Sequence, residues 1–426
     1  MRALVSIAGL VLALAGCQSS DEVPAARSGA AGASVVPPLP DRMPLSPAEL
    51  PTTDSTIAVG NLDAQIAGIE TAHKRSPSTV DWPVQLSGMF GARGKALGRI
   101  ADYEKALALA DEAVRLGPDD PEARLARATA RATFHRFADA DADLEVAAAH
   151  GASRDKVDDL RASLLAATGH DAEALNIRHR LAAERPNIGT LGAEAMSLAA
   201  LGRIAEAEQH FIDAQNHFRD VSPFPLATLY FQAGLIEERN GRPASARELY
   251  EAARLRLPAH AQATAHLATL LASAGKRTQA AQLLQPLADA SDDPEYLAAL
   301  ASVVDGHDAP RLRAQAAQRY DALLARHPEA FGDHAARFWL GIGHDAKRAS
   351  SLAERNLALR PTADAYQLAI EAAVAAGRPA RACALADQAR SASRVGAALQ
   401  LAAHRAYQAC GQPERAEAAL TAAGGR

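Results

Sequence analysis

The residues of this chain that could do chemistry are its three cysteines, its fourteen histidines and a few closely spaced carboxylates. A zinc hydrolase typically carries His-Glu-x-x-His, and many serine hydrolases carry Gly-x-Ser-x-Gly, but neither pattern occurs. None of the histidines stands four residues from another, the spacing that would place two imidazoles on one helical face. We therefore predict that the protein is not an enzyme and uses no metal ion or cofactor.

Three aspartates alternate along one short stretch in the manner of a calcium-binding loop. Asp139, Asp141 and Asp143 occupy the first liganding positions of such a loop. Leu144 stands where the loop needs its glycine, and His150 stands where it needs a bidentate glutamate. We interpret the three carboxylates as belonging to the start of a helix, where negative charge favours the positive end of the helix dipole.

The overall charge excludes one class of partner. The formal net charge is −5, and no block or stripe of lysine and arginine appears along the chain. Binding to nucleic acid requires clustered cations that displace counterions from the phosphates. We therefore expect no nucleic-acid partner.

The first of the cysteines, Cys17, ends an apolar leader. The run from Ala3 to about Ala15 is shorter than the roughly 20 residues that span a bilayer, and it suits the core of a signal peptide. The motif Leu14-Ala15-Gly16-Cys17 resembles the lipobox of bacterial lipoproteins. The alternatives are an ordinary secretion signal with an incidental cysteine, or a buried apolar segment.

The lipobox resemblance implies a lipid anchor at the mature N-terminus. Residues 1–16 would be removed as a signal peptide, and Cys17 would carry acyl chains that hold the protein in a membrane. Gln18 takes the place of the aspartate that retains such proteins at the inner membrane in enteric bacteria. The resemblance therefore points to the outer membrane, with the protein facing the periplasm.

The stretch that follows the cysteine has the composition of a tether. Prolines recur among glycine, alanine and serine across residues 17–56, so the segment cannot bury enough apolar surface to fold by itself. We predict a disordered tether over 17–56, followed by a leading helix or half-repeat over 57–86.

The elements that position the remaining residues are helices in a regular repeat. One alanine, followed by packing residues at +4 and +7, returns at steps of 33 to 36 residues, with one step of 39 before Ala246. These alanines are Ala106, Ala140, Ala174, Ala207, Ala246, Ala280, Ala316, Ala349, Ala382 and Ala416.

A second signal keeps the same phase as the alanines. A glycine stands five residues before six of them, where it would end one helix in a left-handed cap and begin the turn into the next. These glycines are Gly169, Gly202, Gly241, Gly275, Gly377 and Gly411. Repeats around His135, Arg311 and His344 lack this glycine.

The spacing and the two signals resemble the tetratricopeptide repeat, whose period is 34 residues. The resemblance implies an all-α, right-handed α-solenoid of about ten helix-turn-helix repeats. A generic alanine-rich helical bundle is the alternative. The 39-residue step contains Val221-Ser222-Pro223-Phe224-Pro225, so we expect a hinge or kink there, between a first sub-array over 87–222 and a second over 223–426.

In this family the first helix of each repeat lines a concave groove. The resemblance places five side chains on that ligand-facing side by repeat phase alone, and each could equally belong to the core between repeats. They are Met196, Phe231, Leu235, His334 and Phe338.

The other two cysteines fall near the end of the array. The midpoint between Cys383 and Cys410 lies in a predicted loop between repeats, so the antiparallel helices on either side place the two residues opposite each other. The envelope is oxidising, which favours a disulfide. Two free, buried thiols remain the alternative.

These features together predict a membrane-anchored periplasmic scaffold. Its partners would be other envelope proteins in an assembly or export machine, reached through the groove. The last predicted helix, from Glu414 onward, has no polar capping helix after it, so self-association through this C-terminal edge is a further expectation. The alternative functions are binding of glycan or peptidoglycan and a purely structural spacer in the envelope.

Overall fold

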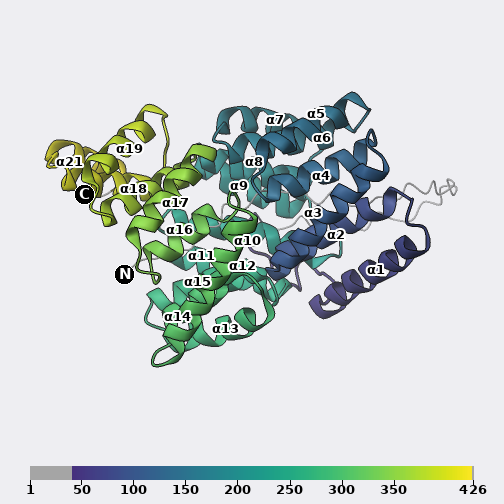
Figure 1. Ribbon diagram of the computed structural model, residues 1–426, viewed down its shortest axis with the longest axis horizontal. Helices are drawn as coiled ribbons and strands as arrows, with labels where there is room; N and C mark the ends of the chain where they lie inside the picture. The colour runs from purple at the N-terminus through teal and green to yellow at the C-terminus, as the bar shows by residue number, and fades with distance from the viewer. Residues whose placement is uncertain (1–40, 425–426) are drawn as a thin grey trace.

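The computed structural model describes residues 41–424, which form 21 α-helices and no β-strand. A leading helix, α1 (Ser55–Arg75), precedes ten antiparallel helical hairpins (Figure 1). The first helices of the hairpins are α2 (Asp81–Leu97), α4 (Pro121–Thr133), α6 (Arg154–Ala167), α8 (Ile188–Ala200), α10 (Pro223–Arg239), α12 (Ala261–Ser273), α14 (Pro294–Val303), α16 (Gly332–Leu340), α18 (Ala363–Ala375) and α20 (Ala397–Ala409).

The second helix of each hairpin packs back on the first. These helices are α3 (Ile100–Leu116), α5 (Phe137–Ala149), α7 (Asp171–Glu184), α9 (Ile204–Asn216), α11 (Pro243–Arg256), α13 (Arg277–Ala290), α15 (Asp308–Arg326), α17 (Ala346–Leu359), α19 (Pro379–Ser391) and α21 (Pro413–Ala422). The first hairpin begins at Asp81, inside the range predicted for the leading half-repeat. No helix within residues 41–424 combines the length and apolar character of a membrane span.

The recurring alanines are the packing points of the array. All ten lie in a second helix, and none exposes more than 4% of its surface. An alanine at this point lets the two helices of a hairpin approach closely, and a larger side chain would hold them apart. The predicted all-α solenoid of about ten repeats is therefore confirmed.

The turn within each hairpin requires a left-handed residue. The six phase-keeping glycines all have φ between 68° and 80°. In two of the hairpins that lack the glycine, a histidine takes the same conformation: φ is 56° at His135 and 54° at His344. Histidine is one of the few non-glycine residues that visit this region, so the turn geometry is preserved without the glycine.

Successive turns of the solenoid touch one another. The hairpin turns near Gly98, His135, Gly169 and Gly202 meet loops that lie about 190 to 225 residues further along the chain. Asp292, for example, accepts hydrogen bonds from the main-chain N–H groups of Ile100 (2.7 Å) and Ala101 (2.8 Å), which begin α3. Figure 1 shows the blue N-terminal hairpins lying beside the green C-terminal ones.

This closure depends on small residues at the points of approach. A Cβ atom on Gly98 would lie 2.6 Å from the Tyr296 ring. A Cβ atom on Gly169 would lie 2.6 Å from the guanidinium of Arg394 and 2.8 Å from the carbonyl oxygen of Pro361. Glycine at these turns thus serves both the local backbone and the contact between turns of the solenoid.

The core continues across the predicted hinge. One hydrophobic cluster runs from Leu175 to Ala419 and includes residues on both sides of position 222. A smaller cluster, from Leu125 to Ala167, is separate from it. The extra residues of the 39-residue step lengthen α10, which has 17 residues where α8 and α12 have 13, and extend the loop 217–222 before it. The packing of the array continues across them.

Candidate functional site: a cleft that holds the N-terminal segment

Three of the predicted groove residues lie in the core. Phe231 and Leu235 in α10 each expose 3% of their surface, and Phe338 in α16 exposes 5%. The Phe231 ring packs 6.0 Å from the ring of Tyr250, centroid to centroid. Met196 is partly buried against the same core. Phe231, Leu235 and Phe338 therefore take the core position that the sequence left open as the alternative, and α10 is buried on nearly every face between Leu226 and Glu237. Met196 keeps part of its surface exposed.

His334, the remaining candidate, is held by carboxylates of two helices. Its Nδ1 lies 3.1 Å from Glu295 of α14, and its Nε2 lies 3.7 Å from Asp333 of α16. Burial by itself would lower the pKa of His334, but the negative charge of Asp333 and the hydrogen bond to Glu295 raise it to about 9. The imidazole is therefore a cation at neutral pH that links neighbouring repeats.

The two distal cysteines are joined. Cys383 in α19 and Cys410, at the C-terminal cap of α20, form a disulfide with their Cα atoms 6.7 Å apart. Cys17, the predicted lipid-bearing residue, lies outside the described residues.

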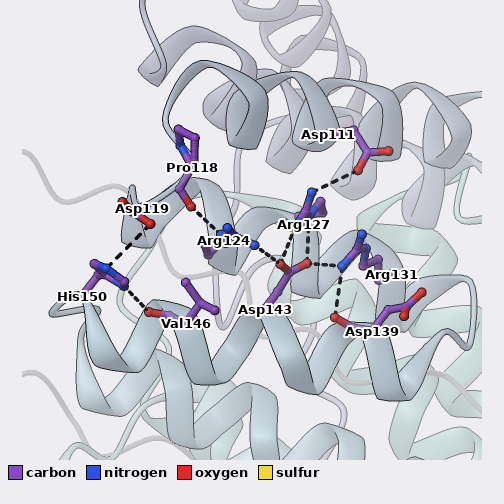
Figure 2. Close-up of polar contacts among 10 residues, drawn as sticks. All are labelled: Asp111, Pro118, Asp119, Arg124, Arg127, Arg131, Asp139, Asp143, Val146 and His150. Atoms are coloured by element: carbon purple, nitrogen blue, oxygen red, sulfur yellow. Dashed lines mark hydrogen bonds and ion pairs between the residues drawn. The ribbon is translucent and has the colours of Figure 1, made fainter.

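The aspartates that resemble a calcium loop belong to a helix, and one of them binds arginines. Asp143 of α5 is buried and receives hydrogen bonds from three arginines of α4: Arg124 (2.9 Å), Arg127 (2.6 Å) and Arg131 (2.6 Å) (Figure 2). The arginines stand at i, i+3 and i+7, so they share one face of α4. Within residues 41–424, no group of three His, Cys, Asp or Glu side chains is arranged to hold a metal ion.

The arginines also set the charge state of this carboxylate. Burial raises the pKa of Asp143, but the hydrogen bonds from Arg127 and Arg124 and the charge of Arg131 outweigh it and hold the pKa below 3.8. The cluster joins α4 and α5, the two helices of the second hairpin, by ion pairs.

The last part of the predicted tether is ordered. Residues 41–54, which we call the strap, contact the C-terminal parts of α9 and α11 and the middle of α10 before α1 begins. Leu45 exposes only 2% of its surface, and Met43 and Leu50 pack against the core of the array. The tether prediction over 17–56 therefore needs correction for these residues, because side chains of the solenoid supply the burial that the strap's own composition lacks.

Three buried side chains hold the strap by its main chain. Gln215 of α9 accepts a hydrogen bond from the N–H of Leu45 (3.0 Å) and donates one to the carbonyl oxygen of Arg42 (2.9 Å). The Tyr230 hydroxyl of α10 accepts from the same N–H of Leu45 (3.2 Å) and donates to Gln215 (3.0 Å).

Arg256, at the end of α11, completes this site. It donates to the carbonyl oxygen of Leu45 (2.9 Å) and to that of Leu50. Beyond it, the N–H of Thr53 donates to the carbonyl oxygen of Val221 in the long loop 217–222 (2.7 Å). The cleft thus binds an extended chain as a partner strand or peptide would be bound, through its amide groups.

Sequence reasoning missed Gln215, Tyr230 and Arg256. Two signals pointed toward them. Gln215 and Arg256 are polar residues at positions where the helical period predicts core, and the 39-residue step marks the loop that the strap contacts.

The C-terminal edge offers little apolar surface. The buried residues of α21 are Ala416 and Ala419, while Glu417 and Ala418 are exposed. No large hydrophobic side chain between position 396 and position 424 is among those that the structure exposes. Self-association through this edge stays a prediction.

Comparison with known proteins supports the repeat assignment. Residues 239–303 match the family model described as tetratricopeptide repeat, a range that includes α11 to α14. No curated protein matches the chain.

Solved structures also match the chain at low sequence identity. Yeast Tom70 is similar at 14% identity and a TM-score of 0.33, over 85% of this chain and 93% of that one. A tetratricopeptide repeat protein from Parabacteroides merdae is similar at 17% identity and a TM-score of 0.33, over 60% of this chain and 93% of that one.

Proposed function

This chain is a tetratricopeptide-repeat protein, and we propose that it is a membrane-anchored periplasmic adaptor that binds other proteins of the cell envelope in an assembly or export machine. Arrays of this family are in general protein-binding scaffolds without catalytic activity. The observation that carries the proposal is the array of ten hairpins, which occupies residues 81–422. Such an array presents an extended surface that suits binding to other proteins.

Two features of the chain support the location. The motif Leu14-Ala15-Gly16-Cys17 resembles a lipobox, and Gln18 follows it, which favours the outer membrane. The disulfide between Cys383 and Cys410 is of the kind that forms in an oxidising compartment such as the periplasm. We propose no catalytic function, cofactor or nucleic-acid partner.

The binding function is tested by crosslinking in intact cells. The protein would carry a C-terminal tag and be extracted in mild detergent, and the copurifying proteins would be identified by mass spectrometry. We expect a discrete set of envelope proteins. Recovery of wall fragments alone, or of the protein alone, would contradict the adaptor function and favour a glycan-binding or spacer function.

The anchor is tested separately. Cells would be fed an alkyne-labelled fatty acid, and the protein would be isolated and checked for label. We expect label on the wild type and none on Cys17→Ser, which should also leave the outer-membrane fraction. Equal labelling of the two would mean that Cys17 is not the lipidated residue.

A further inference from the structure

The strap is bound in a way that another chain could reproduce. Five main-chain groups of the strap accept or donate the bonds that hold it: the N–H and carbonyl of Leu45, the carbonyls of Arg42 and Leu50, and the N–H of Thr53. The one side chain that the site buries almost completely is that of Leu45. Recognition therefore requires an extended chain with a leucine at the right place, and little else of the strap's sequence.

The residues that bind the strap have few other partners. Arg256 donates hydrogen bonds to the carbonyl oxygens of Leu45 and Leu50 and to the Thr52 hydroxyl (3.4 Å) in the strap, and it also bonds the Tyr230 hydroxyl in the wall of the site. Arg256 exposes only 3% of its surface. Without the strap, Arg256 would lose the carbonyl and hydroxyl acceptors of Leu45, Leu50 and Thr52. Another chain that supplied the same acceptors would preserve these bonds and so could take the place of the strap.

Large apolar side chains are exposed at positions next in sequence to residues that hold the strap. Four large hydrophobic side chains are exposed within residues 41–424. Three of them are Val221, whose carbonyl oxygen accepts the N–H of Thr53, Leu255, which precedes Arg256, and Ile57, in the first turn of α1. They are 66%, 63% and 57% exposed.

The site does not select for charge. Two charged residues of the strap, Arg42 and Glu49, form an ion pair with each other. Both side chains are partly exposed to solvent. The walls of the cleft offer an amide, a hydroxyl and a guanidinium that faces carbonyl oxygens. A suitable ligand resembles Met43-Pro44-Leu45-Ser46-Pro47: uncharged, extended and proline-flanked, with one leucine.

We propose that the cleft between α9, α10 and α11 is a peptide-binding site, and that the strap occupies it in cis in competition with an uncharged, leucine-bearing extended segment of a partner protein. This inference rests on the adaptor function and names its site. Because the strap is part of the same chain, its effective concentration is high and the partner binds only when it outcompetes the strap.

The first test uses a peptide of residues 41–54 labelled with fluorescein, and the mature protein in detergent micelles. Leu45→Asp would weaken the strap while leaving the cleft intact. We expect anisotropy to show at least tenfold tighter binding of the peptide to Leu45→Asp than to the wild type. A peptide that carries the same Leu45→Asp change should not bind, and adding Arg256→Met to the Leu45→Asp protein should abolish binding of the unchanged peptide. Far-UV circular dichroism would establish that each variant is folded.

If a folded Leu45→Asp protein does not bind the peptide, the cleft is a purely structural contact and the proposal is overturned. The second test repeats the crosslinking experiment with this variant. We expect higher recovery of at least one envelope protein than with the wild type, and release of that protein by excess free peptide. An identical set from both proteins, unaffected by peptide, would refute the partner site while leaving the adaptor function standing. Failure of the adaptor function itself would show as the absence of any copurifying protein from either.

Discussion

Single residues of this protein carry charge in places that the repeat does not require. Asp143 forms ion pairs with three arginines, and His334 lies between carboxylates of α14 and α16. The sequence singled out both residues, but for a calcium-like spacing and for a groove position. Which charges surround a side chain depends on neighbouring helices, and a helical period specifies only the face on which the side chain begins.

Asp143 is expected to contribute to stability at neutral pH. Asp143→Asn leaves three arginines without their shared anion and should cost about 2 kcal/mol, below the 3–5 kcal/mol typical of a fully buried pair because the arginines are partly exposed. Since the pKa of Asp143 is lowered from 3.8, its contribution is present above pH 3.8 and is lost as the pH falls through the lowered pKa. Urea unfolding at pH 7 and at pH 3 measures both effects.

Asp139→Asn is the matched control for this change. Its side chain is exposed, and only its carbonyl oxygen accepts a hydrogen bond from Arg131. We expect a change within about 0.5 kcal/mol. Equal effects of the two substitutions would show that the arginines gain nothing from Asp143.

His334 is expected to stabilise the fold in acid and to lose that contribution in base. Its pKa is raised from 6.5 to about 9, so the contribution is fully present below pH 6.5 and disappears as the pH rises through 9. The shift corresponds to on the order of 3 kcal/mol. His334→Gln should remove the difference in unfolding free energy between pH 6 and pH 10 that this residue causes.

His307→Gln provides the comparison, because His307 is exposed and makes no side-chain hydrogen bond at the start of α15. It should leave the pH dependence of unfolding as in the wild type. If His334→Gln also leaves it unchanged, Glu295 and Asp333 do not stabilise the imidazolium.

At the scale of the elements, the hairpins follow from local sequence and the strap does not. The period, the buried alanines and the left-handed turns depend on residues that lie within about 34 positions of one another. All three could therefore be predicted from the sequence. The strap has the composition of a disordered segment, and it is ordered by Gln215, Tyr230 and Arg256, which lie 170 to 211 residues away from Leu45.

The disulfide is expected to hold the C-terminal hairpins together. Linking Cys383 and Cys410 closes a loop of sequence separation 27, which in the chain-entropy description stabilises the fold by about 3 kcal/mol. The double variant Cys383→Ala, Cys410→Ala should speed hydrogen exchange in α19 to α21. Exchange in α4 to α9 should stay unchanged and serves as the internal reference; equal protection of α19 to α21 with and without the bond would contradict the expectation.

At the scale of the whole molecule, the contacts between turns of the solenoid decide the shape. Hairpins near Gly98, His135 and Gly169 meet loops near Asp292, Glu329 and Pro361 in register, one repeat after another. Each repeat adds a small rotation and rise, and the sum over about six repeats brings one turn onto the next. A partner consequently reaches this protein at the outer surface or at sites such as the strap cleft, since the turns themselves are in contact.

Substitutions at two glycines of the same backbone conformation test the contact between turns of the solenoid. Gly169 and Gly275 have φ of 80° and 77°, so alanine at either costs about 1–2 kcal/mol of backbone strain. A Cβ on Gly275 meets nothing within 4 Å, whereas one on Gly169 collides with Arg394 and Pro361. Gly169→Ala should therefore destabilise the protein more than Gly275→Ala and alone increase the radius of gyration in small-angle X-ray scattering. Identical scattering from the two variants would mean that the turns stay closed without this contact.

The sequence by itself determined what depends on near neighbours: the helical class, the number and phase of the repeats, the turns, and the pairing of Cys383 with Cys410 as one of two alternatives. Only the tertiary structure decided that α10 is buried on nearly every face, where the strap docks and which loops meet between turns. The reason is physical. A helical period determines on which face of its helix a side chain lies. The rotation between successive hairpins accumulates along the array, and contacts about 190 residues apart depend on the total rotation.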